Sequence, residues 1–169
     1  KFRIKILIEE ALKHSEMFVN GDNPQITAKE PVNRINDAMG KLVATRYHKL
    51  SYMETSPSVS DINALFEKSN QISLSTGATK LVNKLALDDV LQFIELNTGR
   101  HIKTSMKSIV DRFMSAPYGF VEDDIEWLAA MLFKQGGVKL TVNSKVISLI
   151  DTDNADIIRF ITKREYVEK

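Results

Sequence analysis

The chain has 169 residues, no cysteine, and 23 basic against 22 acidic side chains, which gives a formal net charge of +1. This length can bury a sizeable core in one domain or two small ones, and the lack of cysteine excludes disulfides and thiolate metal sites. The near balance of charge predicts no strong field toward nucleic acid or an anionic membrane.

Neither a secretory signal nor a membrane anchor is visible in the sequence. The longest apolar runs fall far short of the roughly 18 residues that a membrane-spanning helix needs, and no signal-peptide pattern is present. We therefore expect no membrane contact and a cytoplasmic location, with which the absence of cysteine is compatible.

Residues 1–54 are predicted to form a helix, a β-hairpin and a long helix. The first helix extends to about His14 and carries the apolar stripe Ile4, Leu7, Ile8, Ala11 and Leu12. A turn-rich loop at 20–24 indicates a hairpin between 17–19 and 25–27. Pro31 suits the first turn of the long helix. Its buried stripe is expected to be Ile35, Ala38, Met39, Leu42, Val43, Tyr47 and Leu50.

Residues 55–60 have the composition of a linker, and residues 61–169 are predicted to form a helical region. Ser60 is expected to cap a short helix that extends through Phe66. The stretch 69–80 is polar and poorly periodic, and we expect it to be irregular.

Two further helices are predicted before residue 117. The first covers about 88–97 and ends at 98–99, where glycine permits a left-handed C-cap. Thr104 is expected to cap the second, which Pro117 prevents from continuing. Its apolar stripe is Met106, Ile109, Val110, Phe113 and Met114.

The most apolar helix of the sequence follows, with Asp123 as its expected N-cap and Glu126 completing a capping box. Trp127 is interpreted as a core residue in preference to a partner anchor, because apolar residues flank it on both sides. The apolar positions cover more than half the helix circumference, so we expect a central helix covered on two sides. They are Ile125, Trp127, Leu128, Ala129, Ala130, Met131, Leu132 and Phe133, and glycines at 136–137 end the helix.

Both ends of the chain have the pattern of interrupted helices. The first helical stripe begins at once after Lys1 without a cap. Near the other end, Asp153 opens a short helix, and Thr162 with Glu165 then predicts a capping box for a helix that stops at Lys169. We therefore expect an excised domain of a longer protein.

The order from residue 87 to residue 150 is helix, helix, helix and two strands, which is typical of a winged-helix domain. The strands are expected at 138–142 and 145–150, with a turn at 143–144. We predict a mainly α fold (α+β): a helical domain with small β-hairpins. Its C-terminal half is winged-helix-like, with three helices plus a two-stranded wing.

Insertion of the third helix into a DNA groove is unfavourable, because carboxylates crowd its first turns where phosphates would approach. Contacts to the DNA backbone remain a possible role for exposed residues of the wing and of the helix connection. These residues are Arg100, Lys103, Lys107, Lys139, Asn143 and Lys145. The alternative is that the lysines are solvated and protect an edge strand from aggregation.

No catalytic, cofactor-binding or metal-binding set is visible. The stretch 75–80 lacks the second glycine and the Lys-Ser/Thr pair of a phosphate loop. His14, His48 and His101 are far apart and lack metal-ligand spacing. The adjacent acids at 123–124 point apart on a helix, and capping explains them. We therefore predict that this chain is not itself an enzyme.

Several motifs resemble one family of proteins. Pro117-Tyr118-Gly119-Phe120, the pattern D-I-x-W-L at 124–128, Leu132-Phe133 and Gly136 are similar to the segment after the ATPase core in the BREX phage-defence ATPases of the BrxC and PglY type. Three other stretches agree with this resemblance: Lys41-Leu42-Val43 with Tyr47, Lys49-Leu50 and Tyr52; Asp61-Ile62; and 162–166.

The resemblance implies a cytoplasmic bacterial protein with an ATPase module upstream of this segment. ATP and Mg²⁺ are then expected for the parent protein, whereas this chain contains neither Walker motif and no cofactor site. We expect a non-catalytic interaction or scaffolding domain, whose partners are other BREX components or the ATPase module, and self-association is possible. The alternative is a winged-helix-like module that binds the DNA backbone non-specifically.

Overall fold

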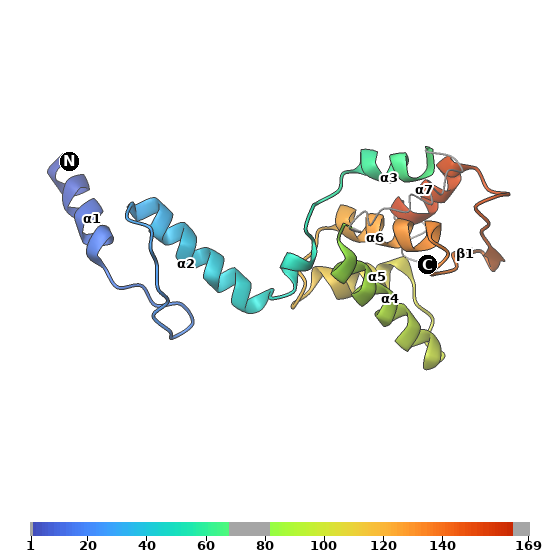
Figure 1. Cartoon of the computed structure of the whole chain (residues 1–169), viewed down its shortest axis with the longest axis horizontal. Coiled ribbons are helices and arrows are strands. Elements are labelled where there is room, and N and C mark those ends of the chain that lie inside the picture. Colours follow the sequence, from blue (N-terminus) through green and yellow to red (C-terminus); the bar gives the residue numbers. More distant parts are fainter. Residues whose placement is uncertain (1, 68–81, 164–169) are drawn as a thin grey trace, which may run out of the picture. The chain divides into compact units, whose positions relative to one another are not determined.

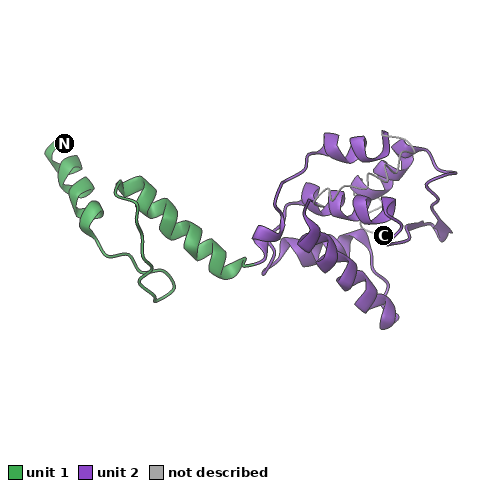
Figure 2. Cartoon of the chain, in the orientation of Figure 1, with its two compact units in different colours: residues 1–48 green, residues 49–169 purple. Residues whose placement is uncertain are grey.

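The structure, a computed structural model, describes residues 2–67 and 82–163. The chain divides into two compact units, residues 1–48 and residues 49–169 (Figure 2). The stretch 55–60, which the sequence predicts to be a linker, belongs to the second unit. The predicted irregular stretch 69–80 lies outside the described residues.

The first unit contains the two predicted helices, α1 (Phe2–His14) and α2 (Pro31–Arg46), with proline in the first turn of α2 (Figure 1). The hairpin predicted between them is wrong. Only an isolated antiparallel bridge forms, Val19 with Asp22, whose N–H to O distances are 2.8 and 3.1 Å. Extending this register would pair Met17 with Pro24, which has no N–H to donate, so the ladder cannot continue.

The apolar stripe of α2 is exposed, which corrects the prediction that it is buried. Neither α1 nor α2 contains a buried residue. Ile35, Met39, Leu42 and Val43 are 44%, 54%, 43% and 41% exposed. The two helices contact each other, but a pair of helices alone cannot enclose an apolar face.

The second unit begins with a segment that side chains hold against the helices that follow. The amide of Lys49 donates to the carbonyl of Pro117 at 3.0 Å, before a 3-10 turn, η1 (Leu50–Tyr52). The fully buried Asn83 bonds both backbone groups of Thr55, at 3.0 and 2.9 Å. The Ser56 hydroxyl donates to Asp124 at 2.6 Å. Residues 49–56 are therefore fixed to the unit by specific polar contacts.

Three helices of this unit have N-termini that differ from prediction. α3 (Val59–Glu67) begins before Ser60, because the amide and hydroxyl of Ser58 donate to the Asp61 carboxylate at 2.8 and 2.7 Å. α4 (Lys84–Gly99) begins earlier than residue 88, since its first turn places buried residues in the core. α5 (Met106–Met114) is capped by Ser105 in a reciprocal pair with Ser108, and the predicted cap Thr104 is wrong.

The predicted central helix is α6 (Glu122–Lys134), and its enclosure is confirmed. It contacts α3, α4, α5 and α7 (Figure 1). The predicted capping box is wrong: the helix begins at Glu122, so Asp124 takes the third position and accepts from the Val121 amide at 3.4 Å. Its buried residues lie all around the circumference and are Asp124, Ile125, Glu126, Trp127, Leu128, Ala129, Ala130, Leu132 and Phe133.

Glycine ends α6 as predicted and the wing follows. Gly136 has a φ of +73°, and the Gly137 amide donates to the Leu132 carbonyl at 2.9 Å. The strands are shorter than predicted: β1 (Thr141–Val142) pairs antiparallel with β2 (Lys145–Val146). Positive φ values of 49° and 64° at the turn residues 143–144 suit the twist of a tight hairpin. After residue 147 the chain turns away, which limits the ladder.

The last described helix is α7 (Asn154–Thr162), opened by Asp153, whose carboxylate accepts from the Ala155 amide at 3.3 Å. Thr162 is its final residue, and its hydroxyl donates to the Ile158 carbonyl at 3.0 Å. The predicted capping box of Thr162 with Glu165 involves residues 164–169, which lie outside the described part. Among the described residues no helix is both long and apolar enough to cross a membrane.

Substitution of a leucine in α6 tests the role of this helix. Leu128 is 0% exposed, whereas Leu96 on α4 is 53% exposed. We expect Leu128→Ala to lower the free energy of unfolding by about 2–5 kcal/mol, because a cavity replaces the side chain. Leu96→Ala makes the same chemical change on a helix and is expected to cost less than about 1 kcal/mol. Chemical denaturation measures both, and equal losses would contradict the central role of α6.

Candidate interaction surfaces

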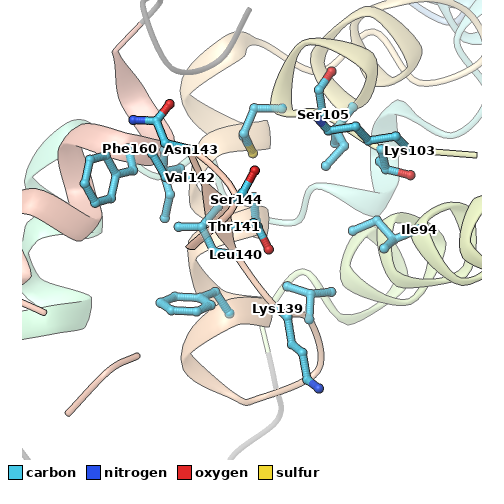
Figure 3. Close-up of a pocket in the computed structure, with 17 residues that line it drawn as sticks. Ile94, Lys103, Ser105, Lys139, Leu140, Thr141, Val142, Asn143, Ser144 and Phe160 are labelled. Atoms are coloured by element: carbon cyan, nitrogen blue, oxygen red, sulfur yellow. The ribbon is translucent and has the colours of Figure 1, made fainter. Parts of the chain in front are cut away.

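The six residues predicted as nucleic-acid contacts are all exposed, and three of them share one pocket. Lys103, Lys139 and Asn143 line a single pocket (Figure 3). Arg100, Lys107 and Lys145 are not among its lining residues. The structure thus brings together half of the predicted set.

The pocket lies where the hairpin faces the helices of the second unit. It has a volume of about 550 Å³ and is lined by 17 residues. Lys103 comes from the connection between α4 and α5, Lys139 from the segment after α6, and Asn143 from the hairpin turn (Figure 3). The apolar part of the lining is Ile94, Met106, Ile109, Ala129, Phe133, Val138, Leu140, Val142, Phe160 and Ile161.

The polar lining of this pocket has an uneven charge. Among the described residues it contains two lysines, Lys103 and Lys139, and no carboxylate. The Oγ1 atom of Thr104, also in the lining, is buried without a hydrogen-bond partner in the described part of the chain. The sequence reveals these lysines but not the hollow, because Phe133 and Ile109 have the same periodic pattern whether they fill a core or line a pocket.

Two of the four carboxylates at the start of α6 are part of the packed interior. Asp124 is 5% exposed and accepts the Ser56 hydroxyl, and Glu126 is 4% exposed. Burial is the largest cause that raises the pKa of Glu126 to about 7, and the negative charges of Glu122 and Asp123 contribute to the same shift. With its neighbours packed on several sides, α6 presents no row of cations that could enter a DNA groove.

The first unit offers a different kind of surface. Large apolar side chains lie along one face of α2, and others along α1, where Ile4, Leu7 and Ile8 are 61%, 58% and 54% exposed. Scattered apolar residues are ordinary on a protein surface, but a contiguous helical face is typical of an interaction site.

Metal chemistry has no evident place in the described residues. Across 2–67 and 82–163, no group of three or more His, Asp or Glu side chains could hold a metal ion. The described histidines, His14, His48 and His101, belong to separate segments.

Motif residues that are distant in the sequence meet in the second unit. Lys49 donates to Asp89 at 2.6 Å and to the Tyr118 hydroxyl at 3.5 Å. Its ammonium also lies 5.3 Å from the ring centre of Tyr52 and 5.1 Å from that of Tyr118. The hydrogen bond to Asp89 is the largest cause that raises the pKa of Lys49. These contacts join the start of the unit to the turn before α6, which is a structural role.

Comparison with known families gives two matches along the chain. A family model described as the winged helix-turn-helix domain of the BREX ATP-binding protein BrxC matches residues 44–169. A second, described as the fourth domain of BrxC with a six-stranded β-sheet, matches residues 1–42. No solved structure matches the chain. The first description agrees with three helices followed by a hairpin, and both agree with the resemblance found in the sequence.

The buried Glu126 predicts a pH dependence of stability. Its pKa is about 7 in the folded state, against an ordinary value of 4.5. At pH values between these two pKa values, Glu126 has released its proton in the unfolded chain but still holds it in the folded chain. The contribution of Glu126 to the free energy of unfolding therefore falls as pH rises and levels off above pH 7. The loss is on the order of 2 kcal/mol, at about 1.4 kcal/mol for each pKa unit with allowance for solvent screening.

Chemical denaturation at a series of pH values measures this slope. Glu126→Gln is expected to remove this part of the slope and to stabilise the protein at alkaline pH, because it leaves no charge to bury. Glu95→Gln, at an exposed position on α4, is the matched control and should keep the wild-type slope. Identical slopes for the two variants would show that Glu126 is already ionised in the folded protein.

Proposed function

Because this chain belongs to the family of the BREX ATP-binding protein BrxC, we propose that it is a non-catalytic interaction and scaffolding domain of a phage-defence ATPase. The matched family models describe a winged-helix domain and the fourth domain, neither of which is an ATPase domain. ATP and Mg²⁺ would then be bound elsewhere in the parent protein. The partners of this domain are other BREX components or the ATPase module, with self-association as a further possibility.

The observation that carries this proposal is the open apolar face of α2. Its side chains at 35, 39, 42 and 43 are all more than two-fifths exposed, and the helix buries none of its residues. Covering such a face is favourable by about 25 cal/mol for each Å² of apolar surface removed from water. Residues 1–48 therefore have more to gain from packing against another element than from their own contacts.

A β-sheet is the proposed cover for this face. The family model over residues 1–42 is described as a domain with a six-stranded sheet, whereas the described residues 2–42 contain two helices and one isolated bridge. A helix with one apolar face packs naturally on one face of a sheet. The sheet would bring this domain into fixed contact with the rest of its protein.

A second candidate function is non-specific binding to the DNA backbone. The observation in its favour is that Lys103, Lys139 and Asn143 lie around one opening. Against it, α6 is enclosed by other helices, and its first turn is acidic. DNA affinity that falls with salt and is lost with Lys139→Glu plus Lys145→Glu would favour this second function over the first.

Paired substitutions on α2 test the scaffolding proposal in the full-length protein. Ile35 and Leu42 are two turns apart on the apolar face, whereas Asn33 and Ala44 lie on the opposite face of the same helix. We expect Ile35→Glu with Leu42→Glu to abolish amide protection in α2 and to reduce co-purification with other BREX components, because it places two charges in an apolar contact. Asn33→Glu with Ala44→Glu should preserve both.

The 169-residue chain, measured without the rest of the protein, is the reference for this experiment. In it all four substituted side chains are exposed, so the two double variants should have similar free energies of unfolding. If the two double variants also behaved alike in the full-length protein, the apolar face would not be a contact and the proposal would fail.

A further inference from the structure

We propose that the pocket beside the hairpin binds an acidic peptide segment of a protein partner, with one large apolar side chain of that segment held inside. This inference rests on the proposed interaction function and names the chemistry of one partner. It concerns only the second unit and is independent of the face of α2.

The size and lining of the pocket select an apolar anchor. A volume of about 550 Å³ falls within the range of roughly 300–1,000 Å³ that is typical of ligand sites. Phe133 and Ile109 belong to the packed core, while other apolar lining residues are only partly buried, among them Ile94, Met106, Val138, Leu140 and Val142. An inserted leucine-sized or aromatic side chain would remove more of this apolar lining from water.

The positive charge of the two lysines that border the pocket favours a peptide with carboxylates on either side of its apolar side chain. Lys103 and Lys139 come from separate segments and lie on different sides of the pocket (Figure 3). Both are exposed, and no salt bridge to either occurs within the described residues. Since none of the described lining residues is a carboxylate, an anionic segment would meet favourable charge from these residues.

The polar lining can also fix the backbone of such a segment. Ser105, Thr141 and Ser144 supply hydroxyl groups, and Asn143 supplies an amide (Figure 3). The Thr104 hydroxyl in the same wall has no partner in the described chain, so a small adjustment of this connection would let it donate to a carbonyl or carboxylate.

A peptide fits these observations better than nucleic acid does. Phosphate contacts need basic groups on an open surface, whereas these two lysines border a hollow with an apolar lining. The other basic residues of the predicted DNA set, Arg100, Lys107 and Lys145, do not line it. Bound DNA would therefore be expected to use residues that a peptide would not.

The direct probe is a fluorescent peptide with one central leucine flanked by glutamates. Its binding to the complete 169-residue chain is measured by fluorescence anisotropy. We expect Lys103→Glu with Lys139→Glu to weaken its binding at least tenfold. Lys107→Glu with Lys145→Glu makes the same change of charge outside the pocket and should weaken binding no more than about threefold, through long-range repulsion alone. Replacing the leucine by glycine, or the glutamates by glutamines, should each also weaken binding.

Three results obtained with a bound peptide would overturn the inference, and so would failure of the peptide to bind. The first is equal loss of peptide binding in the two double variants, and the second is binding that does not require the central leucine. The third is a DNA duplex that competes with the peptide and whose own binding also depends on Lys103 and Lys139. Should the peptide fail to bind while the α2 variants still disrupt co-purification, this inference fails and the scaffolding function stands.

Discussion

The enclosure of α6 by four other helices is the constraint on which the second unit depends. A helix that is buried around its circumference cannot be stable alone, and it gives each of its neighbours an apolar surface to cover. Ile125, Leu128 and Ala130 are each 0% exposed, so the packing leaves no free side. The same enclosure brings Glu126 out of water, and its carboxyl therefore stays protonated to an unusually high pH.

A consequence of this packing is that the helix which reads DNA in many winged-helix domains is closed off here. Asp124 of its acidic first turn is buried and accepts the Ser56 hydroxyl. The hairpin side has an apolar hollow that two lysines border. The first unit has the opposite character, because its two helices keep their apolar faces in solvent. The two units thus have surfaces of different chemical character.

The segment 49–56 shows how polar contacts complete what apolar packing begins. Its composition after residue 54 is that of a linker, yet Asn83 bonds both backbone groups of Thr55. Lys49 is held between Asp89 and the ring of Tyr118. None of these contacts follows a local period in the sequence, because the partners lie 28 to 69 positions away. Such pairings are therefore invisible until the chain is folded.

The sequence by itself determined the helices, the glycine stop after α6 and the hairpin turn at 143–144, because periodicity and turn chemistry are local properties. The family was indicated by the resemblance of short motifs, which are also read directly from the sequence. It placed several helix starts wrongly, because more than one polar residue near each start could form the capping hydrogen bond. The folded structure determines that Ser58, Ser105 and Asp124 form these bonds. Only the tertiary structure decided that the apolar stripe of α2 is open, whereas the enclosure of α6 could be predicted because its apolar positions cover more than half of the circumference. It also decided that Lys103 and Lys139 border one hollow. An apolar period shows which face avoids water, but what covers that face depends on the elements around it.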